Sequence, residues 1–194
     1  MAGPTVPADV LDFWFGPPGS ETRGRHRKEW FEKSEAFDAD CRARFAPAVE
    51  EAIAGGFAAW EETGDGALAL LLLLDQFPRN LFRGSARAFA GDPRARAVAD
   101  RALARGLDRG RPATERVFFY LPFEHSEALA DQNRSCELFA GLDDHEQYDR
   151  VLEYAERHRE IVRRFGRFPH RNAALGRETT AAEGEFLKGP NSSF

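Results

Sequence analysis

The chain has 194 residues, of which 42% are hydrophobic and 30% are charged, as in a soluble protein long enough to bury a core. Its net charge of −5 argues against general nucleic-acid binding, and its longest apolar run, residues 67–74, is too short to span a bilayer. The first residues lack the basic segment and cleavage pattern of a secretory signal, so we expect a cytoplasmic protein.

Helices are predicted throughout the first half of the chain. Pro7 suits a first helical turn. The next helix has Ser34 as its N-cap and should be kinked or split by Pro47. Asp65 can cap GALALLLLLDQF, residues 66–77, whose leucines leave no polar face. Such a helix is expected to be buried on all sides.

Cap and stop residues predict further helices in the second half: from Asp92-Pro93 to Gly106, from Thr114, over 123–140 after Pro122, and over 144–165 before Gly166. Thr180 and Glu183 have the spacing of a capping box and predict a last, short helix. No stretch alternates with a period of two. We therefore predict an all-α fold, a single domain over residues 1–194 built as a bundle or array of about eight to ten helices.

Three segments place a proline after an apolar residue and follow it with polar side chains: FPRN (77–80), LPFEH (121–125) and FPHRN (168–172). Proline ends one helix and can start the next, which leaves free backbone N–H groups beside the polar side chains. Such a corner can bind an anion. We expect the three corners to line a common polar cleft.

Long motifs in these same regions carry a family resemblance: VLDFWFG (10–16), LLLLDQFPRNLFRGSARAFAGD (71–92), FYLPFEHSEALADQ (119–132), RFGRFPHRNAALGRETTAAEGEFL (164–187) and the closing SSF (192–194). Over nearly its whole length, the chain resembles the bacterial family catalogued as domain of unknown function 924. The resemblance implies an all-helical fold similar to tetratricopeptide-repeat (TPR) proteins. It implies no reaction, because the family has no assigned activity.

Asp75 and Gln76 end the leucine-rich helix, where a desolvated carboxylate needs a partner. Arg79 follows Asp75 at the four-residue step of a helical salt bridge, with Asn80 beside it, and Arg83 continues the step. Two interpretations remain open. The pair can be a structural lock, or Asp75 can hold one arginine while another meets a ligand anion.

His125 lies between Glu124 and Glu127, and a histidine beside carboxylates can act as a general base near neutral pH. The same group could hold a divalent metal with His158 or His170. The spacing is not a standard zinc pattern, so we predict no metal and no organic cofactor. The structural alternative is an acidic cluster that caps a helix start.

The stretch 150–177 carries eight arginines against three glutamates, and its FPHRN corner adds a histidine and an asparagine. We expect Phe165 and Phe168 to anchor this corner while its polar side chains face the shared cleft. Planar guanidinium groups recognise carboxylate or phosphate well.

The sequence thus predicts a pocket for a small anionic ligand, with acid–base chemistry by His125 with Glu124 or Glu127. The other predicted ligand-binding residues are Asp75, Gln76, Arg79, Asn80, Arg83, Gln132, His158, Arg167, His170, Arg171 and Asn172. The chain would then be an enzyme on a small anionic metabolite. The alternatives are a TPR-like module that binds an acidic peptide and a purely structural scaffold. No membrane or nucleic-acid partner is expected, and no oligomeric state is predicted.

Overall fold

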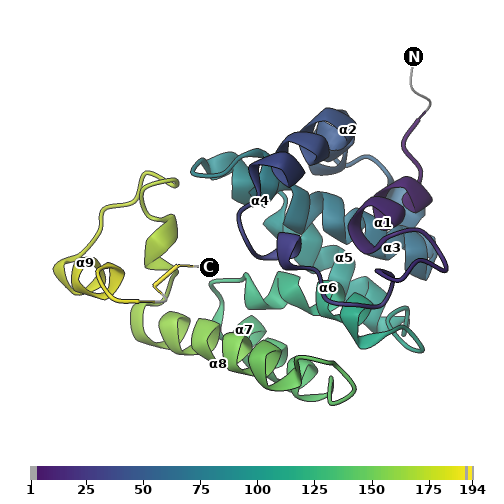
Figure 1. The fold of residues 1–194 in the computed structure, drawn as a ribbon. Helices are drawn as coiled ribbons and strands as arrows, with labels where there is room; N and C mark the ends of the chain where they lie inside the picture. The colour runs from purple at the N-terminus through teal and green to yellow at the C-terminus, as the bar shows by residue number, and fades with distance from the viewer. Residues whose placement is uncertain (1–3, 191, 194) are drawn as a thin grey trace.

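The structure, a computed structural model, describes residues 4–190, 192 and 193, so Phe194 of the closing SSF motif lies outside the described residues. Helix is the only regular secondary structure in this part of the chain, as predicted (Figure 1). The α-helices are α1 (Pro7–Phe15), α2 (Glu35–Ile53), α3 (Gly64–Leu71), α4 (Phe77–Leu81), α5 (Asp92–Ala104), α6 (Ala113–Glu124), α7 (Leu129–Ala140), α8 (Tyr148–Phe165) and α9 (Ala181–Leu187). None of the helices in the described residues has the length and apolar character needed to cross a membrane.

The leucine-rich helix is the centre of the core. Helix α3 runs through a π-helical turn, Leu72–Gln76, directly into α4. Every side chain from Ala67 to Leu74 is at most 1% exposed, which confirms the prediction that this helix is buried on all sides. Helices α1, α2, α5 and α6 pack around it (Figure 1).

The π turn changes how the next helix can approach. The backbone N–H of Phe77 donates to the carbonyl of Leu72, the i→i−5 bond of a π turn. Gly91, just before α5, lies so close that a Cβ there would be 2.1 Å from the carbonyl oxygen of Leu74. Only glycine permits this contact. As a result, Asp92 at the start of α5 lies beside the end of the π turn.

Two of the three expected proline corners are not corners. Pro78 occupies the first turn of α4, where its missing N–H leaves no broken bond, so the helix continues. Pro122 lies inside α6, which ends only at Glu124. Pro169 alone begins a new element, the 3₁₀ turn Pro169–Arg171.

Three other local predictions need correction. The N-cap of α3 is Thr63, whose hydroxyl accepts from the N–H of Gly66, and not Asp65. Pro47 does not split α2. Residues 123–140 do not form one helix, because the chain turns between α6 and α7 and the side chain of Ser126 accepts from the N–H of Ala128 there.

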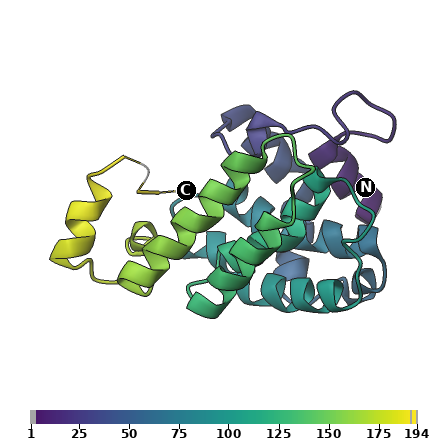
Figure 2. The same cartoon turned by 90° about the horizontal axis from the view of Figure 1, so that it is seen from below.

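Helices α6, α7 and α8 form a second layer of the molecule, and the residues after α8 extend from one end of it (Figures 1 and 2). Helix α8 ends at Gly166, which is left-handed as its predicted role requires. A small second apolar cluster, formed by Ile161, Val162 and Phe168 with Phe165 and Phe186 packed against it, holds the end of α8 against the segment that follows it. It fixes the 3₁₀ turn that carries Arg171.

Candidate functional site

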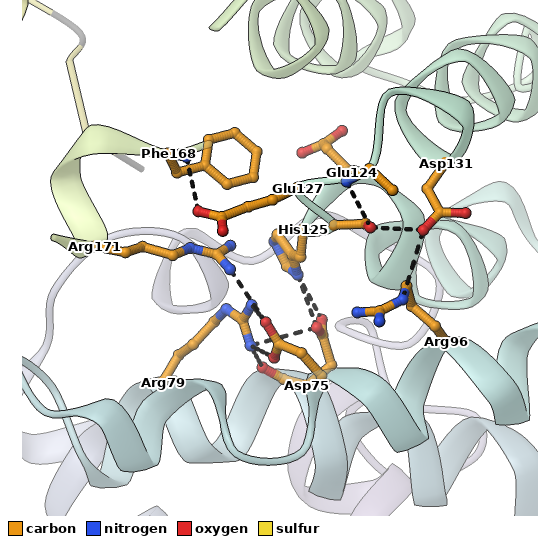
Figure 3. Close-up of polar contacts among 12 residues, drawn as sticks. Asp75, Arg79, Arg96, Glu124, His125, Glu127, Asp131, Phe168 and Arg171 are labelled. Carbon is orange, nitrogen blue, oxygen red and sulfur yellow. Dashed lines mark hydrogen bonds and ion pairs between the residues drawn. The ribbon is translucent and has the colours of Figure 1, made fainter. Parts of the chain in front are cut away.

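A cavity of about 510 Å³ lies between α4, α6, α8 and the 3₁₀ turn at Pro169. This volume is in the range of small-molecule sites. One end of the cavity is polar, and its walls there are formed by Arg79, Glu124, His125, His158, His170 and Arg171. These side chains come from four segments far apart in sequence, and several of them converge in Figure 3.

The imidazole of His125 is held by Asp75. Its Nδ1 lies 2.8 and 2.9 Å from the two carboxylate oxygens (Figure 3). Burial alone would raise the pKa of Asp75, but Arg79 and His125 outweigh it and hold that pKa well below its usual range. An ionised carboxylate can only accept, so Nδ1 carries the hydrogen and Nε2 of the neutral ring has a free lone pair.

His125 itself is kept neutral near physiological pH. Burial lowers the pKa of His125, and the nearby positive charge of Arg79 lowers it further, although Asp75 acts in the opposite direction. A neutral imidazole in a fixed tautomer is the form that accepts a proton. The predicted base is therefore in a suitable state, but its orienting carboxylate is Asp75 and not Glu124 or Glu127.

Asp92 bridges two arginines of the site. Its carboxylate accepts two hydrogen bonds from Arg79, at 3.0 and 3.1 Å, and one from Arg171 at 3.2 Å. Arg79 also lies 3.3 Å from Asp75, so the predicted ion pair is present, and Arg79 itself lines the cavity.

Arg171 is the less completely paired of these arginines. Its side chain is buried, and its Nε has no hydrogen-bond partner among the described residues. The guanidinium carbon lies 4.6 Å from the ring centroid of Phe89 and 4.7 Å from that of Phe168. Burial, together with the charge of Arg79, lowers the pKa of Arg171 to about 10. Its capacity to donate hydrogen bonds is only partly used.

Glu124 and His158 meet on the opposite wall. His158 Nδ1 lies 2.8 Å from the carbonyl oxygen of Tyr154 and 3.4 Å from Oε1 of Glu124. Burial, and to a smaller extent the charge of Asp75, raises the pKa of Glu124 to about 8. Burial holds the pKa of His158 well below its ordinary value. Near neutral pH, Glu124 is therefore mainly protonated and His158 is neutral.

Three other predicted residues line the cavity but are already bound. Gln76 donates to Asp75, and both Asn80 and Arg83 donate to the carboxylate of Asp38 on α2. Arg83 makes two bonds to Asp38, at 2.7 and 3.0 Å, which is the geometry of a structural fork. His170 also lines the cavity, and burial, followed by the charge of Arg171, lowers the pKa of His170 to about 4.

Five predicted residues do not line the cavity, and Asp75, which holds His125 from behind the wall, is one of them. Glu127 accepts two bonds from Arg177 and one from the backbone N–H of Phe168, so it fixes the C-terminal segment. Arg167 forms a fork with Glu183 on α9. Asn172 donates to the same carboxylate. The buried amide of Gln132 donates to backbone carbonyls at the end of α6 and just after it.

Sequence reasoning missed Asp92 as a site residue, although it identified Asp92-Pro93 as a helix start. It also missed Asp38 and the aromatic residues Trp30 and Phe31, which line the far end of the cavity. No sequence pattern pointed to Phe31, because it is followed directly by acidic and basic residues. No group of three or more His, Cys, Asp or Glu side chains suited to a metal occurs among the described residues.

The comparisons with known proteins give a family and no activity. A family model described as "Bacterial protein of unknown function (DUF924)" matches residues 10–191. The solved structure of the protein of unknown function ATU0120 from Agrobacterium tumefaciens is 46% identical, with a TM-score of 0.83. The match covers 94% of this chain and 97% of that one. No curated protein matches the chain.

Proposed function

The chain belongs to the DUF924 family of bacterial proteins, and from the geometry of its cavity we propose that it binds a small molecule through a carboxylate or phosphate group. Arg171 carries the proposal, because it is 6% exposed, lines the cavity and has an Nε–H that lacks a partner among the described residues. An unsatisfied buried donor costs about 1–3 kcal/mol. A ligand oxygen would remove that cost.

The second part of the proposal is acid–base chemistry on the bound molecule. His125 would accept a proton at Nε2, because Asp75 holds the Nδ1–H and stabilises the imidazolium that forms. Glu124, protonated near neutral pH, would return a proton to the ligand. The two groups have environments that move their protonation in opposite directions, as acid and base roles require.

The distribution of polar groups favours a small molecule over an acidic peptide. A groove for a peptide needs polar side chains along successive helices. Here Arg83 at the cavity wall and Arg167 outside it are paired with Asp38 and Glu183. The incompletely paired Arg171 and the two proton-transfer groups, His125 and Glu124, lie together at one end of one cavity.

Calorimetric titration with acetate and with inorganic phosphate tests the proposal. Arg171→Met should weaken binding of the preferred anion at least about tenfold, because a charge-assisted hydrogen bond is worth roughly 1.5–3 kcal/mol. Arg163→Met, at an exposed arginine paired with Glu160, is the matched control and should bind as the wild type does. In the same titrations, wild-type protein should take up a proton and His125→Gln should not.

Circular dichroism shows whether Arg171→Met is folded, and Arg171→Lys provides a second variant. Lysine keeps the charge but not the planar group between Phe89 and Phe168, so it should give an intermediate affinity. Equal anion binding by the wild type and folded Arg171→Met would show that Arg171 is not the anion receptor.

A further inference from the structure

The cavity continues well beyond its polar end, along α6. Val117 and Leu121 precede His125 at four-residue steps, so the three side chains lie on one face of the helix, and all line the cavity. Two helical turns span about 11 Å. The α6 side of the wall therefore changes from polar at His125 to apolar at Val117 over about that length, while His26, Gln147 and Arg150 line other sides of the far part.

Helix α8 forms the wall opposite α6. Arg116, near the start of α6, lies 3.5 Å from Asp144, just before α8 begins. At the other end, His158 lies beside Glu124. The two helices therefore run in the same direction. Val151 on α8 then lines the cavity opposite the part of α6 that precedes Glu124, and its neighbours Arg150 and Tyr154 line the cavity as well.

Aromatic side chains form the rim of the far end, where the imidazole of His26 also lies, with its centroid 5.7 Å from that of Phe31. Trp30 and Phe31 line the cavity there, and the Phe31 ring lies parallel to the ring of Phe118 with centroids 6.3 Å apart. Phe31 is 51% exposed, the largest exposure among the large apolar residues described. An exposed ring at the mouth of an apolar cavity is a surface that a bound apolar group would cover.

The charged side chains at the polar end limit the negative charge that a ligand's head group can carry there. Two arginines, Arg79 and Arg171, face two carboxylates, Asp75 and Asp92, within one ion-pair cluster. One added negative charge can be offset by a proton on His125. A dianion would leave a second charge uncompensated in a poorly solvated site, which is costly.

We propose that the ligand is a monocarboxylate with an unbranched apolar tail, its carboxylate at Arg171 and its tail along Val117, Leu121 and Val151. This inference rests on the proposed function and narrows it. Apolar surface in the far arm would contribute affinity that the polar end cannot supply, and the length of the arm would limit the tail to about two helical turns.

A series of straight-chain carboxylates from acetate to decanoate, titrated calorimetrically, tests this inference. Affinity should rise about three- to fourfold with each added methylene, the equivalent of about 0.8 kcal/mol, and should level off when the arm is full. Primary alcohols of equal length should bind at least tenfold more weakly, and so should the dianionic alkyl phosphates.

Val151→Glu should remove the dependence on chain length, and circular dichroism shows whether the variant is folded. The same change at the exposed Val6, which does not line the cavity, is the matched control and should keep the full dependence.

The outcomes separate the two proposals. If acetate binds in an Arg171-dependent way but affinity does not rise with chain length, the proposed apolar tail is wrong and the proposed function still holds. Tighter binding of alkyl phosphates than of carboxylates would overturn the monoanionic head alone. Failure of every carboxylate and phosphate to bind would overturn both proposals.

Discussion

At Glu124, burial opposes ionisation, and this affects how stability changes with pH. Below its ordinary pKa of 4.5 the carboxyl is protonated in both the native and the unfolded chain. Between that value and about 8, the unfolded chain is ionised while the native protein keeps the proton. The native state then binds more protons, so this residue lowers the free energy of unfolding as pH rises.

We therefore expect Glu124→Gln to gain stability relative to the wild type as pH increases from about 5 to 8, by at most about 1.4 kcal/mol per unit. Urea unfolding at several pH values in this window measures the difference. Glu137→Gln, at an exposed position of α7, should show no such trend. A Glu124→Gln difference that stays constant with pH would mean that Glu124 is ionised in the native protein.

At the scale of the element, the junction of the π turn and α5 depends on one glycine. Gly91 has φ −84°, which any residue can adopt, so its requirement is steric. Because a Cβ would meet the backbone of Leu74, the added methyl group has no flexible neighbour to displace. Asp92, the next residue, would move with it.

Gly91→Ala should lower the free energy of unfolding by about 1–3 kcal/mol, the usual cost of overpacking. It should also weaken anion binding, because Asp92 positions both Arg79 and Arg171. Gly184→Ala, in α9, has open space at its Cβ and should be neutral or gain up to about 1 kcal/mol. Urea midpoints of the two variants decide the matter, and equal midpoints would show that α5 can shift at no cost.

Sequence patterns predicted the starts of α2 and α9 correctly, because the capping side chain and the backbone N–H that it accepts from lie within a few residues of each other. Ser34 accepts from Phe37 at the start of α2, and Thr180 and Glu183 form the expected capping box of α9. Proline misled the prediction at Pro78 and Pro122, because a proline in the first turn of a helix, or one tolerated by buried packing, does not end it.

At the scale of the whole molecule, the polar end of the cavity is assembled by pairs that sequence spacing does not reveal. Asp75 and His125 are 50 residues apart, and Asp92 and Arg171 are 79 apart. Sequence reasoning grouped His125 with its chain neighbours Glu124 and Glu127. It could find the residue types of the site, but the partner of each depends on how the helices pack.

Arg171 belongs to the C-terminal segment that follows α8. Arg167 stabilises this segment through its two hydrogen bonds to Glu183 on α9. We expect Arg167→Ala to speed amide hydrogen exchange across residues 167–187 and leave exchange in α3 unchanged, because the fork to Glu183 lies far from the core. Arg163→Ala on α8 is the control. Faster exchange in α3 as well would mean that the segment and the core unfold as one unit.

The π turn holds one residue more than an α-helical turn in the leucine run. Removing one residue there would let the backbone close into a regular α-helix while α4 keeps nearly its present orientation, so Arg79 would stay beside Asp92. Substituting one apolar residue for another between 68 and 74 alters packing alone. Divergent relatives should therefore tolerate the loss of one residue in this run as well as exchanges of its side chains.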